Sequence, residues 1–470
     1  MMKKPGSWRQ IVWLLIFTLL WGTTPAVGGL FSSLSTEKER ELGEEFFLEL
    51  NNNYPICTDP FVSSYINRLG HKLEAQLPPH PFKYRFYVLD DPSMNAFAVP
   101  GGYVFMNSGF IRLMDKEGEL AGVLAHEISH IYARHMARML DESKPVSIAT
   151  LVGSLAAVLL GGPAAAALLV GSQAAGQAAM LKYSRDHEQE ADDLGFKWLQ
   201  KAGYDPRDMI LAFKKLNKQR WYAGGQPPIY LSTHPHTDTR LVELANRLNM
   251  HADVLPKDHD NQEFQYFALK VDSLSGSPYQ LLRRMTQAAI HEPNNPAYLY
   301  GKALALAKMD HPDEAMGALE QGLKLDPGNY FIRREMAIQY FERNRYQQAL
   351  SLFQRLAQTQ PHDETVLYYL GRIYQEQRQF ADALSAMERV QSLNPAFVEV
   401  YQNLGTLYGE EGQLGLAHYY LGLHSLTSRA LPTALFHFRK ALVNLPLNDP
   451  HYARVKDQIA RLEKMKVKVN

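Results

Sequence analysis

The residues of this chain best suited to chemistry lie in the stretch LAHEISHIYARH, residues 124–135. Residues four apart on a helix project from one face, so His126 and His130 can direct two imidazole nitrogens at a single metal ion. Glu127 lies about 100° further round the helix, where its carboxylate can reach a water on that ion without binding the ion. The spacing predicts two metal ligands and a general base. The alternative is an ordinary helix with a polar face.

A catalytic zinc site needs a third protein ligand and an open fourth position. The stretch RDHEQEADDLG, residues 185–195, is the best source of that ligand. Glu188 and Asp192 are four residues apart and share a helix face. Glu188 is therefore predicted as the third ligand, and Asp192 as the carboxylate that orients a ligand histidine through its free N–H. The alternative is an acidic helix face in solvent.

Two polar neighbours are excluded from this metal site by their positions. His135 follows His126 by nine residues, about 180° round one helix, so it cannot join the pair and is given a structural role. Glu190 is turned about 200° from Glu188 and is expected in solvent.

Both stretches need secondary structure that positions them. Apolar residues recur with helical spacing through residues 117–140, which predicts one long amphipathic helix. Aromatic and β-branched residues predict strands within 84–91 and 95–109, with a Pro-Gly-Gly turn at 100–102. The strand YVFMN, residues 103–107, is expected either to pair with an extended substrate by strand addition or to be an ordinary core strand.

The composition is that of a folded chain with more than one domain. Its 470 residues are 46% hydrophobic and 21% charged, which is enough apolar surface for sizeable cores. Lysine and arginine together number 49, as do aspartate and glutamate, so no overall charge favours nucleic acid as a partner. Cys57 is the single cysteine, which excludes an internal disulfide.

The first 28 residues are expected to direct export. Basic residues precede the apolar run IVWLLIFTLLWG, and small residues follow it. This order is typical of a signal peptide, with cleavage near residues 26–28. The run is short for a membrane span, which needs about 20 residues. The alternative is an N-terminal anchor that is not cleaved.

A second apolar segment lies inside the chain. Residues 145–181 carry no charged side chain and are interrupted by a Gly-Gly-Pro break at 161–163. Each arm is too short to span a bilayer comfortably. The pattern predicts a helical hairpin at 145–182 that packs against its domain. The alternative is peripheral membrane contact through residues 145–180.

From about residue 276 the chain repeats itself every 34 residues. A helix-turn-helix solenoid needs small residues where helices cross, bulky residues between them and a proline that closes each unit. The positions with this period are Pro293, Pro327, Pro361 and Pro395, then Ala303, Ala337, Gly371 and Gly405, then Ala315, Ala349, Ala383 and Ala417, and finally Leu319, Phe353, Met387 and Leu421. The pattern resembles the tetratricopeptide repeat over residues 279–447.

These observations predict two structured parts. The first is an α+β domain, mostly helical, at residues 31–255, and the second is an all-α tetratricopeptide solenoid at residues 276–450. Residues 256–275 are expected to be a linker, and residues 451–470 a C-terminal helix or tail, of which the charged stretch RLEKMKVKVN, residues 461–470, is expected to be a solvated helix.

Three motifs in the first part resemble the HtpX- and Oma-type zinc metallopeptidases. They are NAFAVPGGYVFMNSG, AHEISHIYARH and SRDHEQEAD, in this order, within about residues 35–250. The resemblance implies a zincin-like fold, zinc endopeptidase activity and one Zn²⁺ per chain. HtpX itself has several transmembrane helices, and this chain has none of comparable length. The roles that the resemblance implies are zinc binding by His126, His130 and Glu188, acid/base catalysis by Glu127, and support of the ligands by Asp192.

The resemblance also singles out the stretch STHPHTDTRL, residues 232–241. Family members carry a histidine before a proline there, which corresponds to His234. This side chain is expected to reach the zinc in a resting state or to stabilise the oxyanion. His236 is the competing choice. In the implied mechanism the zinc-bound water has a pKa near about 7, and Glu127 passes its proton to the leaving amine.

The resemblance places the chain in the Gram-negative periplasm, in quality control of unfolded or misassembled outer-membrane proteins. The solenoid is expected to recruit clients or partners, among them the outer-membrane barrel-insertion machinery. The rival hypothesis is a non-proteolytic adaptor or chaperone with a structural or vestigial metal site. A structural zinc site is usually rich in cysteine and has no use for Glu127, which favours the enzyme.

Overall fold

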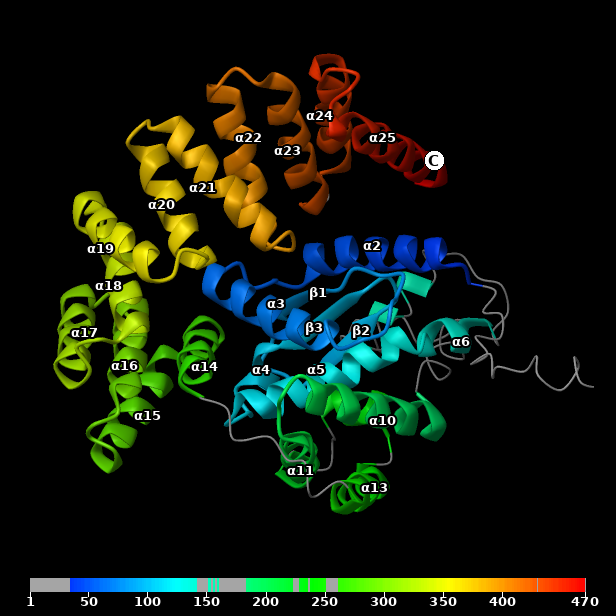
Figure 1. Cartoon of the computed structure of the whole chain (residues 1–470), viewed down its shortest axis with the longest axis vertical. Coiled ribbons are helices and arrows are strands. Elements are labelled where there is room, and N and C mark those ends of the chain that lie inside the picture. The colour runs from blue at the N-terminus through cyan, green and yellow to red at the C-terminus, as the bar shows by residue number, and fades with distance from the viewer. Residues whose placement is uncertain are drawn as a thin grey trace, which may run out of the picture.

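The computed structural model describes residues 34–141, 151–153, 155–156, 159, 183–222, 228–235, 237–250, 261–428 and 430–469. In this part of the chain a small sheet lies among helices, and a long row of helices curves round it (Figure 1). The first part mixes strands and helices and the second is helical, in agreement with the predicted fold class.

Three strands form the sheet, β1 (Arg85–Leu89), β2 (Ala96–Val99) and β3 (Tyr103–Asn107). Their order is β1-β3-β2, with β1 parallel and β2 antiparallel to β3. The predicted turn before β3 requires glycine, because Gly101 and Gly102 have φ values of 89° and 99°. β3 is the central strand and both its edges are paired. Of the two expectations for this strand, strand addition is therefore wrong and an ordinary core strand is confirmed.

Helices around this sheet carry the two candidate site stretches. α5 (Glu117–Tyr132) holds the histidines and α10 (Arg185–Lys201) holds the acidic stretch, and the two helices pack against each other. Gly195 of α10 permits this approach, because a Cβ there would lie 3.2 Å from the backbone nitrogen of His126. The other helices of this part are α2 (Thr36–Asn53), α3 (Pro60–Glu74), α4 (Ser108–Ile111), α6 (His135–Asp141), α11 (Pro206–Tyr222), α12 (Ile229–Thr233) and α13 (Thr237–Met250).

The single long helix predicted for residues 117–140 is wrong, because the chain breaks after α5. Arg134 has a φ of 54°, in the left-handed region that side chains rarely adopt, and α6 begins at the next residue. The Arg134 side chain donates to Glu39 and to the Leu34 carbonyl, each at 2.7 Å. These long-range contacts fix the turn. The helical periodicity of the sequence runs through the break, so pattern alone does not reveal it.

The segment predicted as a linker, residues 256–275, contains a helix. The helix is α14 (Gln262–Ser275). Residues 256–260 of the segment lie outside the described part of the chain. Phe264 and Phe267 of α14 are buried, and the Phe267 ring stacks on Tyr65 of α3 at 4.0 Å between centroids. The expectation of a plain linker is therefore wrong over this helix.

The solenoid consists of helices of similar length joined by short turns. Successive helices pack on one another along the row (Figure 1). The helices are α15 (Pro278–His291), α16 (Pro296–Lys308), α17 (Pro312–Leu325), α18 (Tyr330–Glu342), α19 (Tyr346–Thr359), α20 (Glu364–Glu376), α21 (Phe380–Leu393), α22 (Val400–Glu410), α23 (Leu414–Thr427), α24 (Leu431–Asn444) and α25 (Pro450–Val469).

The period of 34 residues appears in the backbone and in the packing. The turns inside four successive units place a left-handed residue at the same position, namely Asp310, Asn344, Arg378 and Gly412. A Cβ on Gly405 would lie 2.7 Å from Leu421 Cγ, and one on Gly371 would lie 2.9 Å from Met387 Cε. Small residues thus lie where helices cross and meet the predicted bulky residues, which confirms the repeat.

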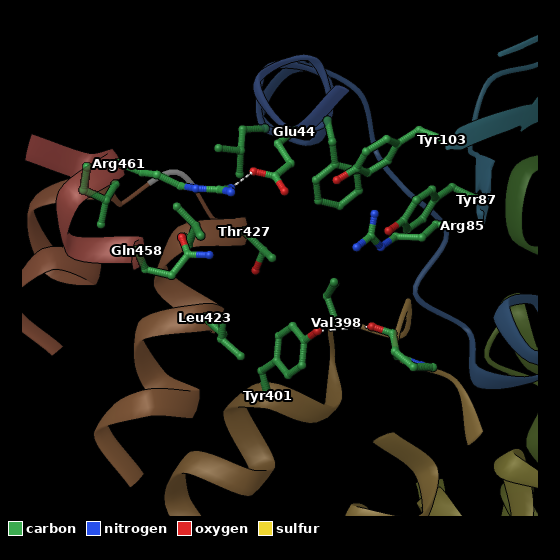
Figure 2. A pocket seen from close by; sticks show the side chains of 15 residues that line it. Glu44, Arg85, Tyr87, Tyr103, Val398, Tyr401, Leu423, Thr427, Gln458 and Arg461 are labelled. Carbon is green, nitrogen blue, oxygen red and sulfur yellow. Dashed lines mark hydrogen bonds and ion pairs between the residues drawn. The ribbon is translucent and has the colours of Figure 1, made fainter. Parts of the chain in front are cut away.

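The solenoid packs back against the α+β part. α20 contacts α3, and α23 contacts α2. The Arg334 guanidinium carbon lies 3.9 Å from the centre of the Phe61 ring, and Arg461 of α25 forms an ion pair with Glu44 of α2. A cavity remains between the sheet and helices α22, α23 and α25 (Figure 2).

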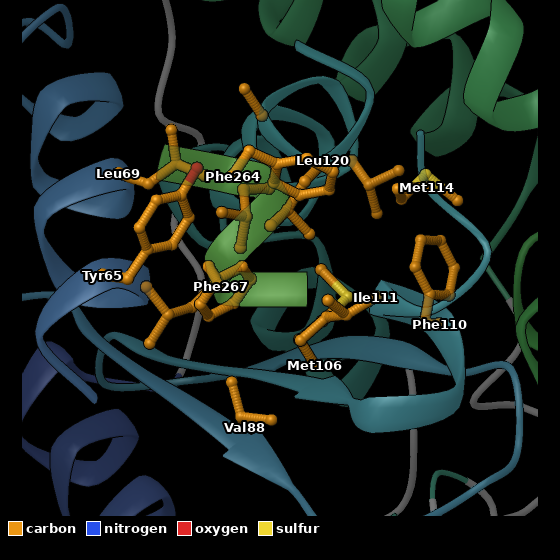
Figure 3. Packing of buried hydrophobic residues seen from close by; sticks show 14 of the residues in the cluster. Tyr65, Leu69, Val88, Met106, Phe110, Ile111, Met114, Leu120, Phe264 and Phe267 are labelled. Atoms are coloured by element: carbon orange, nitrogen blue, oxygen red, sulfur yellow. The ribbon is translucent and has the colours of Figure 1, made fainter. Parts of the chain in front are cut away.

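The hydrophobic core is continuous from the α+β part into the first repeats. Figure 3 shows its centre, where α3, the sheet, α4, α5 and α14 meet. Ala303, Leu319 and Ile332 of the solenoid belong to the same cluster of buried residues. The two parts are therefore packed as one unit, which fixes how the solenoid is held beside the site.

Two predicted segments lie wholly or largely outside the described residues. The signal peptide at 1–28 is outside them, as is most of the hairpin at 145–182. The hairpin's described Leu155 and Leu159 are buried in a cluster with Phe46 of α2. Among the described helices, none has the length and apolar character of a membrane span.

The C-terminal helix is less exposed than its charge suggests. Val455 and Leu462 of α25 are buried against the last repeats. Within residues 461–470 the expectation of a solvated helix is wrong at Leu462, which belongs to a helical apolar stripe among charged residues, and the side chains from residue 464 on lie outside the described ones.

Candidate metal centre

Side chains from α5, α10 and the end of α12 meet in the interior. His126, His130, Glu188 and His234 are buried and each offers a ligand atom, and these atoms all lie within 4.8 Å of one another. His126 Nε2 lies 3.0 Å from His130 Nε2, and the Glu188 oxygens lie 3.6 Å from each imidazole. The separations of 3.0–3.6 Å among the His126, His130 and Glu188 atoms are those expected of ligands that share one ion with bonds of about 2 Å.

Asp192 contacts the ring nitrogen of His126 that faces away from this cluster. Its Oδ1 lies 2.9 Å from His126 Nδ1. A proton on Nδ1 that is donated to this carboxylate leaves Nε2 with its lone pair toward the cluster. Burial alone would raise the pKa of Asp192, but the Arg240 guanidinium lowers it below the ordinary value, so the acceptor is charged.

Arg240 of α13 is a site residue that the sequence analysis missed. Its guanidinium donates to both oxygens of Asp192 at 2.7 Å and lies 2.5 Å from Glu188 Oε2. The residue is 3% exposed and packs over the Phe213 ring at 4.7 Å. No spacing rule links a lone arginine to acids about 50 positions earlier. The one sequence signal for Arg240 was its place in the stretch STHPHTDTRL, which the family resemblance had already singled out for its histidines.

His135 contacts the second histidine of the pair. Its Nδ1 lies 2.8 Å from His130 Nδ1, and its Nε2 lies 3.1 Å from Glu190 Oε2. A proton on His130 Nδ1 is then donated to His135, and a proton on His135 Nε2 to Glu190. The left-handed turn at Arg134 makes this contact available, whereas a continuous helix would carry His135 to the opposite side. Glu190 is 45% exposed, which confirms the expectation that it lies in solvent, and it also accepts from Arg138.

His234 closes the cluster from the side of α12. Its Nδ1 lies 2.9 Å from Glu188 Oε1 and 3.4 Å from His126 Nε2, and its Nε2 lies 3.6 Å from Glu127 Oε1. The ring stacks on Tyr230 at 4.4 Å between centroids. Of the two candidate histidines in this stretch, the structure brings His234 to the cluster, and His236 lies outside the described residues.

Glu127 faces the same interior space, where His234 Nε2 lies 3.6 Å from its Oε1. The side chain is buried, and neither carboxylate oxygen has a well-aligned hydrogen bond to a described residue. Burial raises the pKa of Glu127 to about 7, although His234 opposes the shift. A buried carboxylate without a partner is costly unless a ligand or water completes it.

The donor set fits a catalytic zinc. Burial lowers the pKa of His126 and of His130, so both imidazoles are neutral as metal ligands must be. Burial works against ionisation of Glu188, but Arg240 lowers its pKa overall and the carboxylate is charged. Two imidazoles, one carboxylate and a base beside them match a catalytic site, whereas the cysteine-rich set of a structural site is missing from the cluster.

Both parts of the chain are similar to known proteins. Residues 59–248 match peptidase family M48, and residues 296–329 and 340–408 match tetratricopeptide repeats. A beta-barrel assembly-enhancing protease of Yersinia pestis is 32% identical over 347 residues, which are 72% of this chain and 70% of that protein. The mitochondrial metalloendopeptidase OMA1 of Schizosaccharomyces pombe is 27% identical over 217 residues, 46% of this chain and 62% of that one. The solved structure of MamA from Desulfovibrio magneticus RS-1 is 22% identical with a TM-score of 0.28, and covers 38% of this chain and 97% of that one.

The fold, the buried donor set and these matches define a zinc metallopeptidase. The chain belongs to peptidase family M48, with tetratricopeptide repeats after the peptidase part. The predicted resemblance to the Oma-type enzymes and the predicted zinc cofactor are thereby confirmed.

Proposed function

We propose that His126, His130 and Glu188 hold the catalytic zinc of this endopeptidase. The observation that carries the proposal is the meeting of two imidazole nitrogens and a carboxylate oxygen, from α5 and α10, at one buried point. The buried carboxylate of Glu127 at the same point, without an aligned hydrogen bond to a described residue, supports it, because a general base must face the reacting water.

The chemistry follows from the positions of these side chains. When bound, the zinc polarises the scissile carbonyl and lowers the pKa of its water toward about 7. Glu127 takes a proton from the attacking water and delivers it to the leaving amine nitrogen. A carboxyl whose pKa is raised to about 7 suits both steps, because it gains and loses a proton readily at neutral pH. Asp192 and His135 hold the two imidazoles in the tautomer that presents Nε2.

His234 occupies the space that a substrate carbonyl needs. It contacts Glu188 and lies beside Glu127, and it is buried there. We assign it the resting-state role, in which it caps the centre and moves away with the α12 segment when a substrate binds. The alternative role, stabilisation of the oxyanion, requires the same side chain to remain near the reacting carbonyl.

The substrate strand is assigned to β2 in place of β3. β2 pairs with β3 along one edge only among the described strands, and it packs against α5. An extended peptide that adds to this edge binds through its backbone, so side chains of many kinds are accepted. Such tolerance suits a protease that acts on misfolded clients.

The biological setting follows the relatives. Because the Yersinia relative is named a beta-barrel assembly-enhancing protease, we assign this chain to the periplasm, with unfolded or misassembled outer-membrane proteins as substrates. The solenoid supplies the surface that recruits clients and the outer-membrane barrel-insertion machinery. No role with nucleic acid is proposed, since the chain has equal numbers of basic and acidic residues.

The decisive experiment removes the base and keeps the metal. Glu127→Gln should lower kcat for casein hydrolysis by more than about 100-fold, while zinc content stays near one ion per chain. Purified wild type and variant are compared by metal analysis and by release of labelled casein fragments. Loss of zinc from the variant would show that Glu127 is a ligand, and full activity would show that the base lies elsewhere.

A further inference from the structure

A second candidate binding site lies between the α+β part and the solenoid. It is a cavity of about 180 Å³ that shares no lining residue with the metal centre. One wall comes from α2, β1 and β3, and the other from α22, α23 and α25 (Figure 2). Neither part of the chain forms this cavity alone, so its shape depends on how the solenoid is docked.

The walls are apolar and aromatic. Phe47 lies 4.9 Å from Tyr87 and 5.6 Å from Tyr103 between ring centroids, which gives one continuous aromatic wall. Tyr401 and Leu423 face it from the solenoid (Figure 2). A flat apolar group can therefore be held on both faces.

One cation points into this apolar space without an ion pair to a described carboxylate. Arg85, the first residue of β1, places its guanidinium 5.0 Å over the Tyr103 ring and reaches into the cavity (Figure 2). The one acid that lines the cavity, Glu44, forms an ion pair with Arg461 from the opposite wall. Among the described residues no carboxylate forms an ion pair with Arg85, and Glu44 acts on it only beyond ion-pair distance because its carboxylate pairs with Arg461.

The approach to the cavity is also basic. An adjoining hollow of about 230 Å³ shares Glu44, Arg85 and Tyr103 with it and is lined further by Arg40 and Lys83. Both of these additional cations are exposed; Arg40 forms an ion pair with Glu37, whereas Lys83 forms none with a described residue. A negatively charged group is therefore attracted to the mouth and meets Arg85 at the boundary between the two spaces.

We infer that this cavity binds the C-terminal residue of a polypeptide, with an apolar side chain among the aromatic rings and the terminal carboxylate on Arg85. A cavity of about 150 Å³ holds one benzene molecule, so this space of about 180 Å³ takes one large side chain. A planar guanidinium pairs with a carboxylate through two parallel hydrogen bonds. The inference rests on the proposed function in one respect, that the ligands of this enzyme are polypeptides. It assigns capture of the client's end to the interface and cleavage to the metal centre.

The test measures binding with cleavage switched off. In full-length Glu127→Gln protein, a fluorescein-labelled hexapeptide that ends in phenylalanine is titrated as the free acid and as the C-terminal amide, by fluorescence anisotropy. We expect the free acid to bind roughly 10–100-fold more tightly, the range for hydrogen bonds to a charged group. Arg85→Gln should remove this preference, while Arg283→Gln, an exposed arginine of α15, should leave it intact.

A second variant keeps the inference testable if Arg85→Gln does not fold. Val398→Trp fills the cavity from the solenoid side and should weaken both forms of the peptide while it leaves Arg85 in place. Equal binding of acid and amide, or a preference that survives in Arg85→Gln, would overturn the inference. Binding of sodium dodecanoate by a protein sample that does not bind the peptide would overturn it as well. If wild type fails to cleave casein and the Glu127→Gln chain still prefers the free acid, the proposed function fails and this inference stands.

Discussion

The metal centre and the solenoid are built on opposite principles. The metal centre joins single side chains from α5, α10, α12 and α13, with His126 and Arg240 separated by 114 residues. The solenoid joins neighbours, and the contact between a small and a bulky residue recurs every 34 residues. Substitution of one of these side chains therefore removes a role, such as metal binding or proton transfer, that no other residue supplies at the centre. In the solenoid the same change weakens one unit among several.

Loss of a proposed ligand should have the largest effect. Glu188→Gln removes the charged oxygen between the two imidazoles, and zinc affinity should fall by more than the roughly 10–100-fold that loss of a supporting residue costs. Equilibrium dialysis against a zinc chelator measures the change. Asp186→Asn, an exposed acid on the first turn of the same helix, is the control and should bind zinc normally. Unchanged zinc content in Glu188→Gln would place the third ligand elsewhere.

Arg240, the buried arginine, should contribute most to stability when the metal is removed. Arg240→Met leaves the buried carboxylates of Asp192 and Glu188 without a cation, which costs about 3–5 kcal/mol of unfolding free energy. Zinc restores a positive charge beside Glu188, so the thermal midpoint should differ more between zinc-loaded and chelator-treated variant than it does in wild type. Arg247→Met on the same helix, whose partner Asp193 is partly exposed, should leave that difference unchanged. An equal gap in all three proteins would contradict the pairing.

Loss of the supporting histidine should have an intermediate effect. His135→Ala leaves His130 Nδ1 without its acceptor at 2.8 Å, and zinc affinity should fall roughly 10–100-fold. His135→Asn should recover part of it, because the amide oxygen can accept the same hydrogen bond. His311→Ala, an exposed histidine of the solenoid, is the control. A normal affinity in His135→Ala, measured by competition with a fluorescent chelator, would return His135 to a purely structural role.

The smallest effect on the centre should come from the solenoid. Gly405→Ala places a Cβ 2.7 Å from Leu421 Cγ and should cost about 1–3 kcal/mol of local stability. Gly409→Ala, four residues later on α22, meets its nearest atom at 3.9 Å and should be neutral or slightly stabilising. Hydrogen exchange of α22 and α23 reports the difference. Casein hydrolysis at 25 °C should be unchanged in both, and a large loss would mean that the solenoid and the centre are coupled.

Local pattern predicted what depends on near neighbours. The pairs His126 with His130 and Glu188 with Asp192 follow from one helical turn each, and the strands around Gly101 and Gly102 follow from a turn that needs glycine. The 34-residue period fixed the small and bulky positions of the repeats. The helix of residues 117–140 failed because its break at Arg134 is held by Glu39 and Leu34, which lie about 100 positions earlier.

The sequence by itself determined the chemistry of this protein, because metal ligands and a base at one-turn spacing carry their own geometry. Only the tertiary structure decided which side chains support that chemistry. His135 reaches His130 through a broken helix, and Arg240 reaches Asp192 from another helix. The cavity at Arg85 likewise exists only where the solenoid docks on the sheet. Such contacts join residues far apart in the chain, and no local periodicity encodes a distance that arises from packing.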